Sequence, residues 1–362
     1  MENIYKNKHI LFLTAFFYPY LNGATIRNYK TISALKKAGY QITIVSPFAG
    51  REDLPSLALG RWPFSWLRFR KFIKHLKKNN PIDLVYSESW QFDLLGSYAA
   101  KKFGVKQIID IHGPEKKEII ENMPAGITKK IILYFLKKHQ KVLQKATALT
   151  VAEKPIVDWL ITELGLNKDK MTVIENYPDA ELFKFVKHVS HKPFCVGFLG
   201  TLQIGRISPL LQTMQALPNF RLKVLGTGDG EEEIKKLSNA ELKAANAYEQ
   251  VPAQLADFDL GVIFSLKPEG MTDKGAPMKF YEYLLAGVPV LAVNFEYLRG
   301  EIEGNNLGKV CAVAEIKTAL LDIAANYEKY QIGVENYQDV LRNKYSWQQQ
   351  EEKLLTLINS LV

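Results

Sequence analysis

Short apolar runs alternate with helical patterns along the chain, and this alternation limits the fold more than any other feature of the sequence. Residues 9–14 and 40–46 are β-branched or aromatic runs, and a helical pattern over residues 26–37 separates them. Parallel strands cannot be joined by tight hairpins, so strands separated by helices predict a parallel sheet with crossover helices. The further strands predicted in this half are residues 83–86, 105–110, 147–151 and 171–174, and the further helices are residues 69–78, 99–103 and 129–144.

The same alternation restarts after a polar stretch at residues 185–193. The predicted strands there are residues 194–199, 220–225, 260–264 and 288–293, and the predicted helices are residues 209–216, 231–237 and 280–286, the first beginning near Ser208. A chain of 362 residues is long enough for about two domains. We therefore predict an α/β protein with two doubly wound domains, residues 1–188 and 189–345, and a terminal helix at 346–362 that crosses back to the first domain. Such sheets bind ligands beyond the carboxyl ends of their strands.

Composition narrows the class of protein further. Apolar residues make up 47% and charged residues 23% of the chain, which is typical of a folded globular protein. Its two cysteines, Cys195 and Cys311, form no C-x-x-C pair, so we expect no disulfide framework, no structural zinc and a reducing, cytoplasmic compartment. The longest apolar run, residues 10–21, is about half of the ~20 residues that a membrane crossing requires. The polar start of the chain likewise predicts no secretory signal.

The most informative stretch is residues 276–292, which combines a helix start, two charged residues and a helix end. Pro277 suits a first helical turn and Gly287 suits the left-handed residue after a helix. The N–H groups of the first turn, together with Lys279, favour an anion. Glu282 lies further along the same helix, where its two carboxylate oxygens could accept hydrogen bonds from the two hydroxyls of a ribose.

With these residues the sequence resembles the retaining GT-B glycosyltransferases, in particular glycosyltransferase family 4. Glu282 matches the second glutamate of the family's Glu-x7-Glu motif, which holds the donor ribose. Arg206 lies where the family usually has a lysine beside the donor diphosphate. The remaining segments that resemble the family, in the expected order along the chain, are residues 22–27, 110–113, 173–183, 196–217 and 225–228.

The resemblance implies a GT-B fold, in which two Rossmann-like domains face each other across a cleft. It also implies transfer of a sugar from a nucleotide-diphosphate donor to a glycan or lipid-linked acceptor, with retention of configuration and with neither a metal ion nor another cofactor. His112 and Asp273 are the predicted catalytic residues, and His112 corresponds to the histidine beside the reacting sugar. The predicted donor-binding residues are Gly23, Thr201, Arg206, Lys274, Gly275, Ala276, Met278, Lys279 and Glu282.

Two positions depart from the family pattern. Lys274 stands where the family has its first glutamate, so Asp273 or Glu269 would have to contact the donor sugar in its place. Thr201 stands near the position where many members have an arginine, which removes one cation near the diphosphate. Two alternatives therefore stay open beside the transferase: a sugar-nucleotide 2-epimerase of the same fold, and a degenerate glycosyltransferase that serves as a binding subunit.

Each candidate residue also has a purely structural interpretation. Glu282 could lie on a solvated helix face, His112 could be an ordinary core or surface histidine, and Arg206 could be a loop cation. The glycines of residues 226–230 do not have the spacing of a dinucleotide-binding loop, so a plain turn is favoured. The Asp-Phe-Asp at residues 257–259 precedes a strand where a metal-binding pair should follow one, so we predict no metal site.

The chain carries 47 Lys and Arg against 38 Asp and Glu, a net charge of +9 that favours anionic partners. Residues 59–78 interleave aromatic and basic side chains. This pattern fits single-stranded nucleic acid, an anionic membrane or a crossover helix with a solvated basic face. We favour peripheral binding to the inner face of a membrane over nucleic acid, and residues 129–145 form a second basic helix. The predicted acceptor or membrane surface is Arg61, Trp62, Trp66, Arg68, Arg70 and Lys71.

Overall fold

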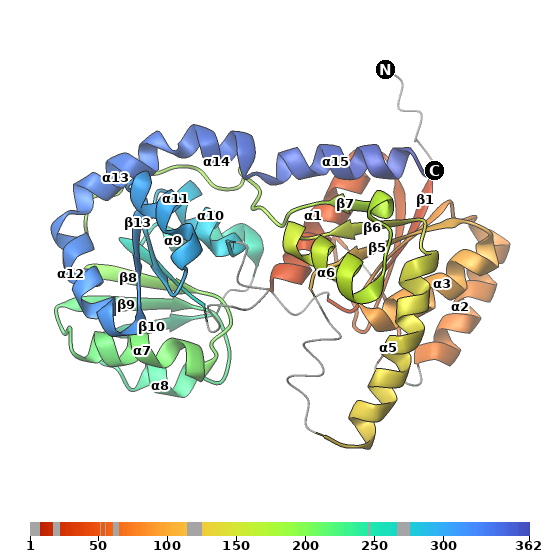
Figure 1. The fold of residues 1–362 in the computed structure, drawn as a ribbon, viewed down its shortest axis with the longest axis horizontal. Helices are drawn as coiled ribbons and strands as arrows, with labels where there is room; N and C mark the ends of the chain where they lie inside the picture. The colour runs from red at the N-terminus through yellow and green to blue at the C-terminus, as the bar shows by residue number, and fades with distance from the viewer. Residues whose placement is uncertain are drawn as a thin grey trace. The chain divides into compact units, whose positions relative to one another are not determined.

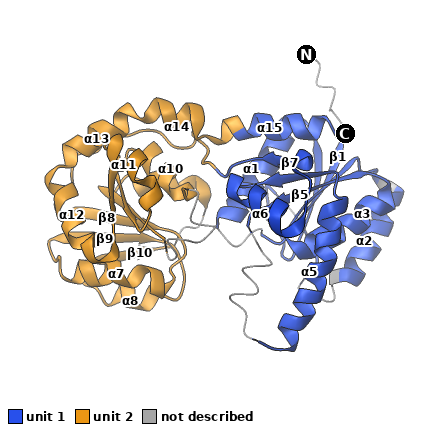
Figure 2. Ribbon diagram, viewed as in Figure 1, with its two compact units in different colours: residues 1–176, 350–362 blue, residues 177–349 orange. Residues whose placement is uncertain are grey.

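The computed structural model describes residues 8–16, 22–50, 52–54, 56–60, 65–113, 125–244, 247–265 and 276–362 (Figure 1). The chain divides into two compact units, which Figure 2 shows in different colours. Unit 1 consists of residues 1–176 and 350–362, and unit 2 consists of residues 177–349. The last helix, α15 (Trp347–Asn359), has most of its length in the segment that clusters with unit 1.

Unit 1 is built on a seven-stranded parallel sheet with the order β3-β2-β1-β4-β5-β6-β7. The strands are β1 (His9–Thr14), β2 (Gln41–Ser46), β3 (Ser56–Ala58), β4 (Leu84–Glu88), β5 (Lys106–Ile111), β6 (Ala148–Val151) and β7 (Met171–Val173). The helices are α1 (Gly23–Lys37), α2 (Ser65–Asn79), α3 (Trp90–Phe103), α5 (Ile127–Lys145) and α6 (Lys154–Leu164). All residues of the central strands β1 and β4 are buried, because helices cover both faces of a parallel sheet.

Unit 2 repeats this architecture with a six-stranded parallel sheet of order β10-β9-β8-β11-β12-β13. The strands are β8 (Phe194–Leu199), β9 (Phe220–Leu225), β10 (Ala240–Lys243), β11 (Leu260–Phe264), β12 (Val290–Val293) and β13 (Gly308–Cys311). The helices are α7 (Ile204–Gln215), α8 (Glu231–Lys235), α9 (Val251–Leu255), α10 (Met278–Leu285), α11 (Arg299–Gly304), α12 (Ile316–Ala325), α13 (Tyr327–Asn336) and α14 (Gln338–Lys344).

The predicted α/β class with two doubly wound sheets is confirmed, and the predicted strands at residues 9–14, 194–199, 220–225 and 260–264 have the observed bounds. The sequence did not predict the edge strands β3, β10 and β13 or the helices α6, α9, α11, α12, α13 and α14. The strands β3 and β10 lie at the sheet edges and contain no buried residue, so they lack the apolar pattern that marks a strand.

The predicted start of the first helix in unit 2 is wrong. We expected the helix to begin near Ser208 because proline favours a first helical position, but α7 begins at Ile204 and contains Pro209. Pro209 is the sixth residue of this helix, where it cannot donate the hydrogen bond that an interior helical residue makes to the carbonyl four positions earlier. The correction matters for the site, because it moves Arg206 from a loop into the first turn of a helix.

The basic helix α2 faces the core with its aromatic side chains. Phe69 is fully buried, and Phe72 and Trp66 pack against the same core cluster, whereas Arg70 and Lys71 are exposed. The interleaved pattern therefore separates into an apolar inner face and a basic outer face. Among the described residues, no helix has the combination of length and hydropathy that a membrane crossing requires.

Candidate functional site

In unit 2, two glycine-containing loops pack closely at the carboxyl ends of β8 and β9. A Cβ atom on Gly226 would lie 1.9 Å from the carbonyl oxygen of Gly200. Gly200 has a φ of +133°, and a Cβ atom there would lie 2.8 Å from Nζ of Lys279. Glycine is therefore required at both positions, since any side chain would separate the loops or displace the lysine. The two loops are therefore in contact, and the ammonium of Lys279 lies against Gly200.

Two cations lie beside these loops, each in the first turn of a helix. Arg206 belongs to α7 and Lys279 to α10. Burial, followed by the positive charge of Arg206, lowers the pKa of Lys279 to about 8, and the carboxylate of Glu282 opposes both effects. The ammonium also lies 4.8 Å from the ring centroid of Phe198. Adjacent like charges at helix N-termini form a site that an anion would stabilise.

Glu282 is 2% exposed, so it does not lie on a solvated helix face. Its carboxylate lies beside Tyr248, whose pKa is raised by burial first and by Glu282 second. The next residue, Tyr283, fixes the helix to the sheet, because its hydroxyl accepts a 2.7 Å hydrogen bond from the N–H group of Leu199 at the end of β8. The helix therefore holds Lys279 and Glu282 at a defined distance from the glycine loops.

The ends of α10 agree partly with the sequence analysis. Pro277 is the N-cap residue rather than the first helical residue, because its ψ of 148° is extended. Gly287 has the predicted left-handed conformation, with a φ of +90°. The N–H groups of Gly287 and Val288 donate to the carbonyls of Leu284 and Tyr283, which is the Schellman arrangement.

Of the other donor-binding candidates in unit 2, the structure describes only Thr201, Ala276 and Met278. Thr201 is exposed in the loop between β8 and α7. Ala276 and Met278 flank the N-cap of α10 and are partly buried. Asp273, Lys274 and Gly275 lie outside the described residues, as does Glu269.

The other two motifs of unit 2 have structural roles. The N–H group of Gly228 donates to Glu231 and Gly230 is the N-cap residue of α8, so residues 226–230 form the expected turn. Asp257 pairs with Lys223, and Asp259 accepts hydrogen bonds from the backbone and ring of His191. In the part of the chain that the structure describes, no three His, Cys, Asp or Glu side chains converge as a metal site.

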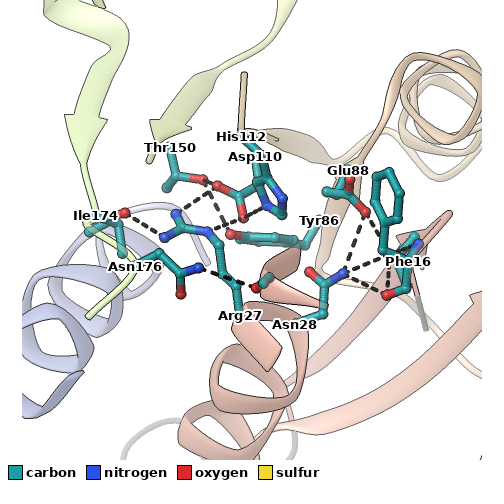
Figure 3. Close-up of polar contacts among 12 residues, drawn as sticks. Phe16, Arg27, Asn28, Tyr86, Glu88, Asp110, His112, Thr150, Ile174 and Asn176 are labelled. Atoms are coloured by element: carbon teal, nitrogen blue, oxygen red, sulfur yellow. Dashed lines mark hydrogen bonds and ion pairs between the residues drawn. The ribbon is translucent and has the colours of Figure 1, made fainter. Parts of the chain in front are cut away.

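In unit 1, a buried network of charged side chains lies at the carboxyl ends of β1, β4 and β5 (Figure 3). The guanidinium of Arg27 on α1 donates to both oxygens of Asp110 at 2.8 Å, and the ring of His112 lies 2.9 Å from Asp110. Thr150 donates a 2.7 Å hydrogen bond to the same carboxylate. Arg27 and Asp110 are 1% and 2% exposed, so water does not screen their charges.

These contacts set the protonation states of the pair. Burial alone would raise the pKa of Asp110, but the charges of Arg27 and then His112 hold it well below its ordinary value. Burial alone would lower the pKa of His112, but the Asp110 carboxylate raises it above its ordinary value. Because Asp110 stays ionised, the imidazole Nε2 carries a proton and its N–H group donates a hydrogen bond to the carboxylate. His112 is thereby held in one orientation, which a merely exposed histidine would not be.

A second carboxyl group, Glu88, lies beside this pair. Burial raises the pKa of Glu88 to about 7, although the positive charge of His112 and the hydrogen bond from Thr14 oppose the effect. The Thr14 hydroxyl donates to Glu88 at 2.6 Å. Asn28 donates to the same oxygen at 3.4 Å (Figure 3). Glu88 therefore exchanges its proton near neutral pH.

A small cavity beside His112 contains another histidine–carboxylate pair. His139 of α5 lies 2.8 Å from Asp93 of α3, and both side chains line this cavity together with His112. Burial raises the pKa of Asp93, and His139 opposes this change. Ser89, which also lines the cavity, has a φ of +76° between β4 and α3, a strained conformation for a residue with a side chain.

Gly23, the donor-binding candidate of unit 1, is the first residue of α1, and its carbonyl accepts a 3.2 Å hydrogen bond from Asn176. The sequence analysis quoted Arg27 and Asp110 only as the ends of motifs, and it missed Glu88. The sequence could have indicated Glu88, because Thr14, Glu88 and Asp110 each lie at or near the carboxyl end of a strand, β1, β4 and β5 respectively. The register pairs Thr14 with Glu88 and Glu88 with Asp110.

The predicted acceptor or membrane surface is only partly described. Trp66 packs edge-on against Tyr98 with ring centroids 5.0 Å apart. Arg68 is exposed and donates a 3.3 Å hydrogen bond to the carbonyl of Leu59, and Arg70 and Lys71 are exposed. Arg61 and Trp62 lie outside the described residues.

Two parallel doubly wound sheets, each in its own compact unit, are the architecture of the GT-B fold. Residues 21–182 match the family model of Glycosyltransferase Family 4. The predicted resemblance to this family is thereby confirmed for residues 21–182. The sequence matches no curated protein.

Solved structures share this fold over nearly the whole chain. Sucrose-phosphate synthase from Thermosynechococcus elongatus has a TM-score of 0.75 at 14% identity, covering 98% of this chain and 99% of that one. Anabaena Alr3699/HepE in complex with UDP-glucose has a TM-score of 0.73 at 16% identity, covering 98% and 100%. A glycosyltransferase from Rickettsia africae has a TM-score of 0.69 at 17% identity, covering 98% and 99%. At these identities the similarity establishes the fold.

Proposed function

We propose that this protein is a glycosyltransferase that moves a sugar from a nucleoside-diphosphate donor to a glycan or lipid-linked acceptor, with retention of configuration and without a metal ion. The observation that carries the proposal is the pair of neighbouring cations, Arg206 and Lys279, held at two helix N-termini beside the buried carboxylate of Glu282. Anabaena HepE was crystallised with UDP-glucose, which makes a uridine nucleotide a natural first candidate for the donor.

In the proposed reaction, unit 2 stabilises the negative charge of the leaving diphosphate and transfers no proton. Negative charge builds on the leaving diphosphate as the glycosidic bond breaks, and fixed cations aimed at it lower the barrier. Arg206 and Lys279 supply these charges, with Lys274 and the N–H groups from Gly275 to Met278 as further proposed donors. Glu282 accepts hydrogen bonds from the ribose hydroxyls. No covalent bond to the protein is proposed.

In unit 1 we assign His112 to the transferred sugar, with Asp110 as its positioning residue. A protonated or hydrogen-bonded imidazole held by Asp110 can donate to a sugar hydroxyl without reorganising. Asp273 is proposed as the acidic contact of the donor sugar, in place of the family's first glutamate. The peripheral membrane association expected from the basic surface remains part of this proposal.

The proposal is tested by incubating the protein with a panel of nucleotide sugars after a thermal-shift screen of uridine, guanosine and adenosine diphosphates. Slow release of free nucleoside diphosphate with the corresponding free sugar supports a transferase. Appearance of the 2-epimer of the sugar supports an epimerase instead. Nucleotide binding with no turnover on any donor supports a binding subunit, and both of these results contradict the proposal.

A further inference from the structure

The first half of α5 exposes apolar side chains that the core of unit 1 does not use. Ile127, Ile131 and Tyr134 are 72%, 42% and 56% exposed. Their spacing of four and three residues places them on one face of the helix. The first buried residue of α5 is Leu136, nine positions after its start. In Figure 1 this half of the helix extends beyond the other helices of unit 1.

The charged side chains of α5 itself are all basic. The sequence of α5 contains no Asp or Glu, and the same is true of α2. The exposed lysines of α5 are Lys130, Lys137, Lys138, Lys141 and Lys145. An exposed apolar stripe with lysines on its flanks is the pattern of a helix that lies in the interface of an anionic membrane.

The apolar face continues into a groove between α3 and α5. The groove has a volume of about 910 Å³, and its lining carries one charged side chain, Lys138, among the described residues. Ile131 belongs both to the exposed stripe and to the groove lining. The other apolar side chains of its wall include Trp66, Trp90, Phe92, Leu95 and Phe135.

We propose that this groove holds the hydrocarbon chain of an anionic lipid while the first half of α5 lies in the bilayer interface. An apolar chain would cover side chains that are now exposed, and the lysines would face the anionic headgroups. The Lys138 ammonium lies 4.6 Å from the ring centroid of Tyr134, at the point where the groove meets the stripe. A cation at this rim is complementary to a phosphate attached to the chain.

Two other occupants fit the observations less well. Single-stranded nucleic acid needs several exposed aromatic rings for stacking. Tyr134 is one such ring, but Phe69 of α2 is buried and Trp66 packs against Tyr98. A second copy of this chain would bring its own lysines against those of α5, which is unfavourable without acidic partners on either helix. An anionic lipid would bury the apolar side chains with its hydrocarbon chain and would pair its headgroup with the lysines.

The lipid serves as the acceptor only if the proposed transferase function is correct, whereas binding of an anionic bilayer does not depend on it. The first experiment is flotation of the full-length protein with vesicles of phosphatidylcholine alone or of equal parts phosphatidylcholine and phosphatidylglycerol. We expect binding to the mixed vesicles, with little binding to phosphatidylcholine. We also expect salt to weaken the binding.

Substitutions test whether vesicle binding depends on the apolar stripe of Ile127, Ile131 and Tyr134 or on exposed apolar side chains in general. Ile127→Ser, Ile131→Ser and Tyr134→Ser together should lower the partition coefficient about tenfold or more, because these side chains lose their burial in lipid. The matched control replaces three exposed apolar residues of unit 2, Leu321, Ile332 and Val340, by serine and should bind as the wild type does. A second variant replaces Lys130, Lys137 and Lys141 by glutamine and should also bind the vesicles more weakly. Its matched control replaces the exposed lysines Lys236, Lys317 and Lys329 of unit 2 by glutamine and should bind as the wild type does.

The groove itself is tested by tryptophan fluorescence, because Trp66 and Trp90 both line it. Phosphatidylglycerol with brominated chains should quench the wild-type emission, and the quenching should be much smaller in the Trp66→Phe/Trp90→Phe variant. Equal quenching in the two proteins would show that no chain enters the groove and would overturn that part of the proposal.

The outcomes distinguish this inference from the proposed function. A protein that binds nucleotides but not anionic vesicles, or whose stripe variant binds vesicles as well as the control does, overturns the inference and leaves the transferase proposal intact. A protein that binds vesicles but no nucleotide overturns the transferase proposal alone. A wild-type dimer that becomes monomeric in the stripe variant assigns the face to a second copy and also overturns the inference.

Discussion

The guanidinium of Arg27 holds the carboxylate of Asp110 through two hydrogen bonds of 2.8 Å, Nε to Oδ2 and Nη2 to Oδ1, inside unit 1. Arg27 also donates to the carbonyl of Ile174 (Figure 3). This bidentate pair joins helix α1 to strand β5, and through Asp110 it orients His112. One buried arginine therefore supports both the packing of the unit and the geometry of its candidate catalytic histidine.

We expect Arg27→Met to destabilise the protein by about 3–5 kcal/mol, because it leaves the Asp110 carboxylate buried without its main partner. Urea unfolding gives this difference in the free energy of unfolding. The control is the double substitution Arg27→Met/Asp110→Asn, which removes both charges and should recover part of the loss. A single variant as stable as the wild type would show that the ion pair contributes nothing.

Glu88 makes the stability of the wild type depend on pH. Its pKa is raised from 4.5 to about 7, so the protonated form favours the folded state. The resulting stabilisation is complete below the unfolded pKa and is lost as the pH rises through about 7, with a total on the order of 3 kcal/mol. Glu88→Gln should remove this decline. Urea unfolding at about pH 5 and about pH 8 gives the free energy of unfolding of both proteins. An equal loss of stability between these pH values in the wild type and in Glu88→Gln would contradict the prediction.

His112 contributes stability of the same sign for a different reason. The Asp110 carboxylate raises its pKa, so the stabilisation is complete below the unfolded histidine pKa and disappears as the pH rises through the folded value. His112→Gln should therefore cost more free energy of unfolding in mildly acidic than in alkaline solution. Titration of the His112 ring by NMR provides a direct measurement, and Asp110→Asn should lower its pKa.

The same His112→Gln substitution should lower the rate of sugar transfer while leaving the affinity for the nucleoside diphosphate unchanged. The reason is that the proposed nucleotide contacts, Arg206, Lys279 and Glu282, all belong to unit 2. Isothermal titration with the diphosphate and a turnover assay separate the two quantities. Loss of nucleotide affinity in this variant would contradict the assignment of His112 to the sugar.

Lys279 predicts a pH dependence of nucleotide binding. With a pKa lowered to about 8, the side chain carries its charge at neutral pH and loses it in alkaline solution. Affinity for the diphosphate should fall by about tenfold between pH 7 and pH 9. Lys279→Arg, which stays charged, should bind with little change over this range. An equally steep fall in the arginine variant would assign the effect to another group.

Glu282→Ala should weaken donor binding by roughly 1–3 kcal/mol, as expected for hydrogen bonds to a charged group. The 2′-deoxy form of the nucleotide is the matched control, because it lacks one of the ribose hydroxyls and should show a smaller penalty on substitution. Unchanged affinity in Glu282→Ala would remove this residue from the nucleotide site.

Much of the fold followed from local patterns. The runs at residues 9–14 and 194–199 are continuous apolar segments because both faces of a parallel sheet are covered, so their bounds could be predicted. Edge strands such as β3 lack that pattern. The start of α7 was predicted too late because a proline at its sixth position was interpreted as a helix start.

The residues of the candidate site likewise fall into those that the sequence predicted and those that only the structure identified. The sequence by itself determined the two alternating halves and the motif that carries Lys279 and Glu282, since these depend on residue spacing within single elements. Only the tertiary structure decided that Glu88 is buried beside His112 and that Arg27 neutralises Asp110 across 83 positions of the chain. The physical reason is that the pairing and burial of charges depend on which strand ends and helices lie side by side, and local spacing does not specify those neighbours.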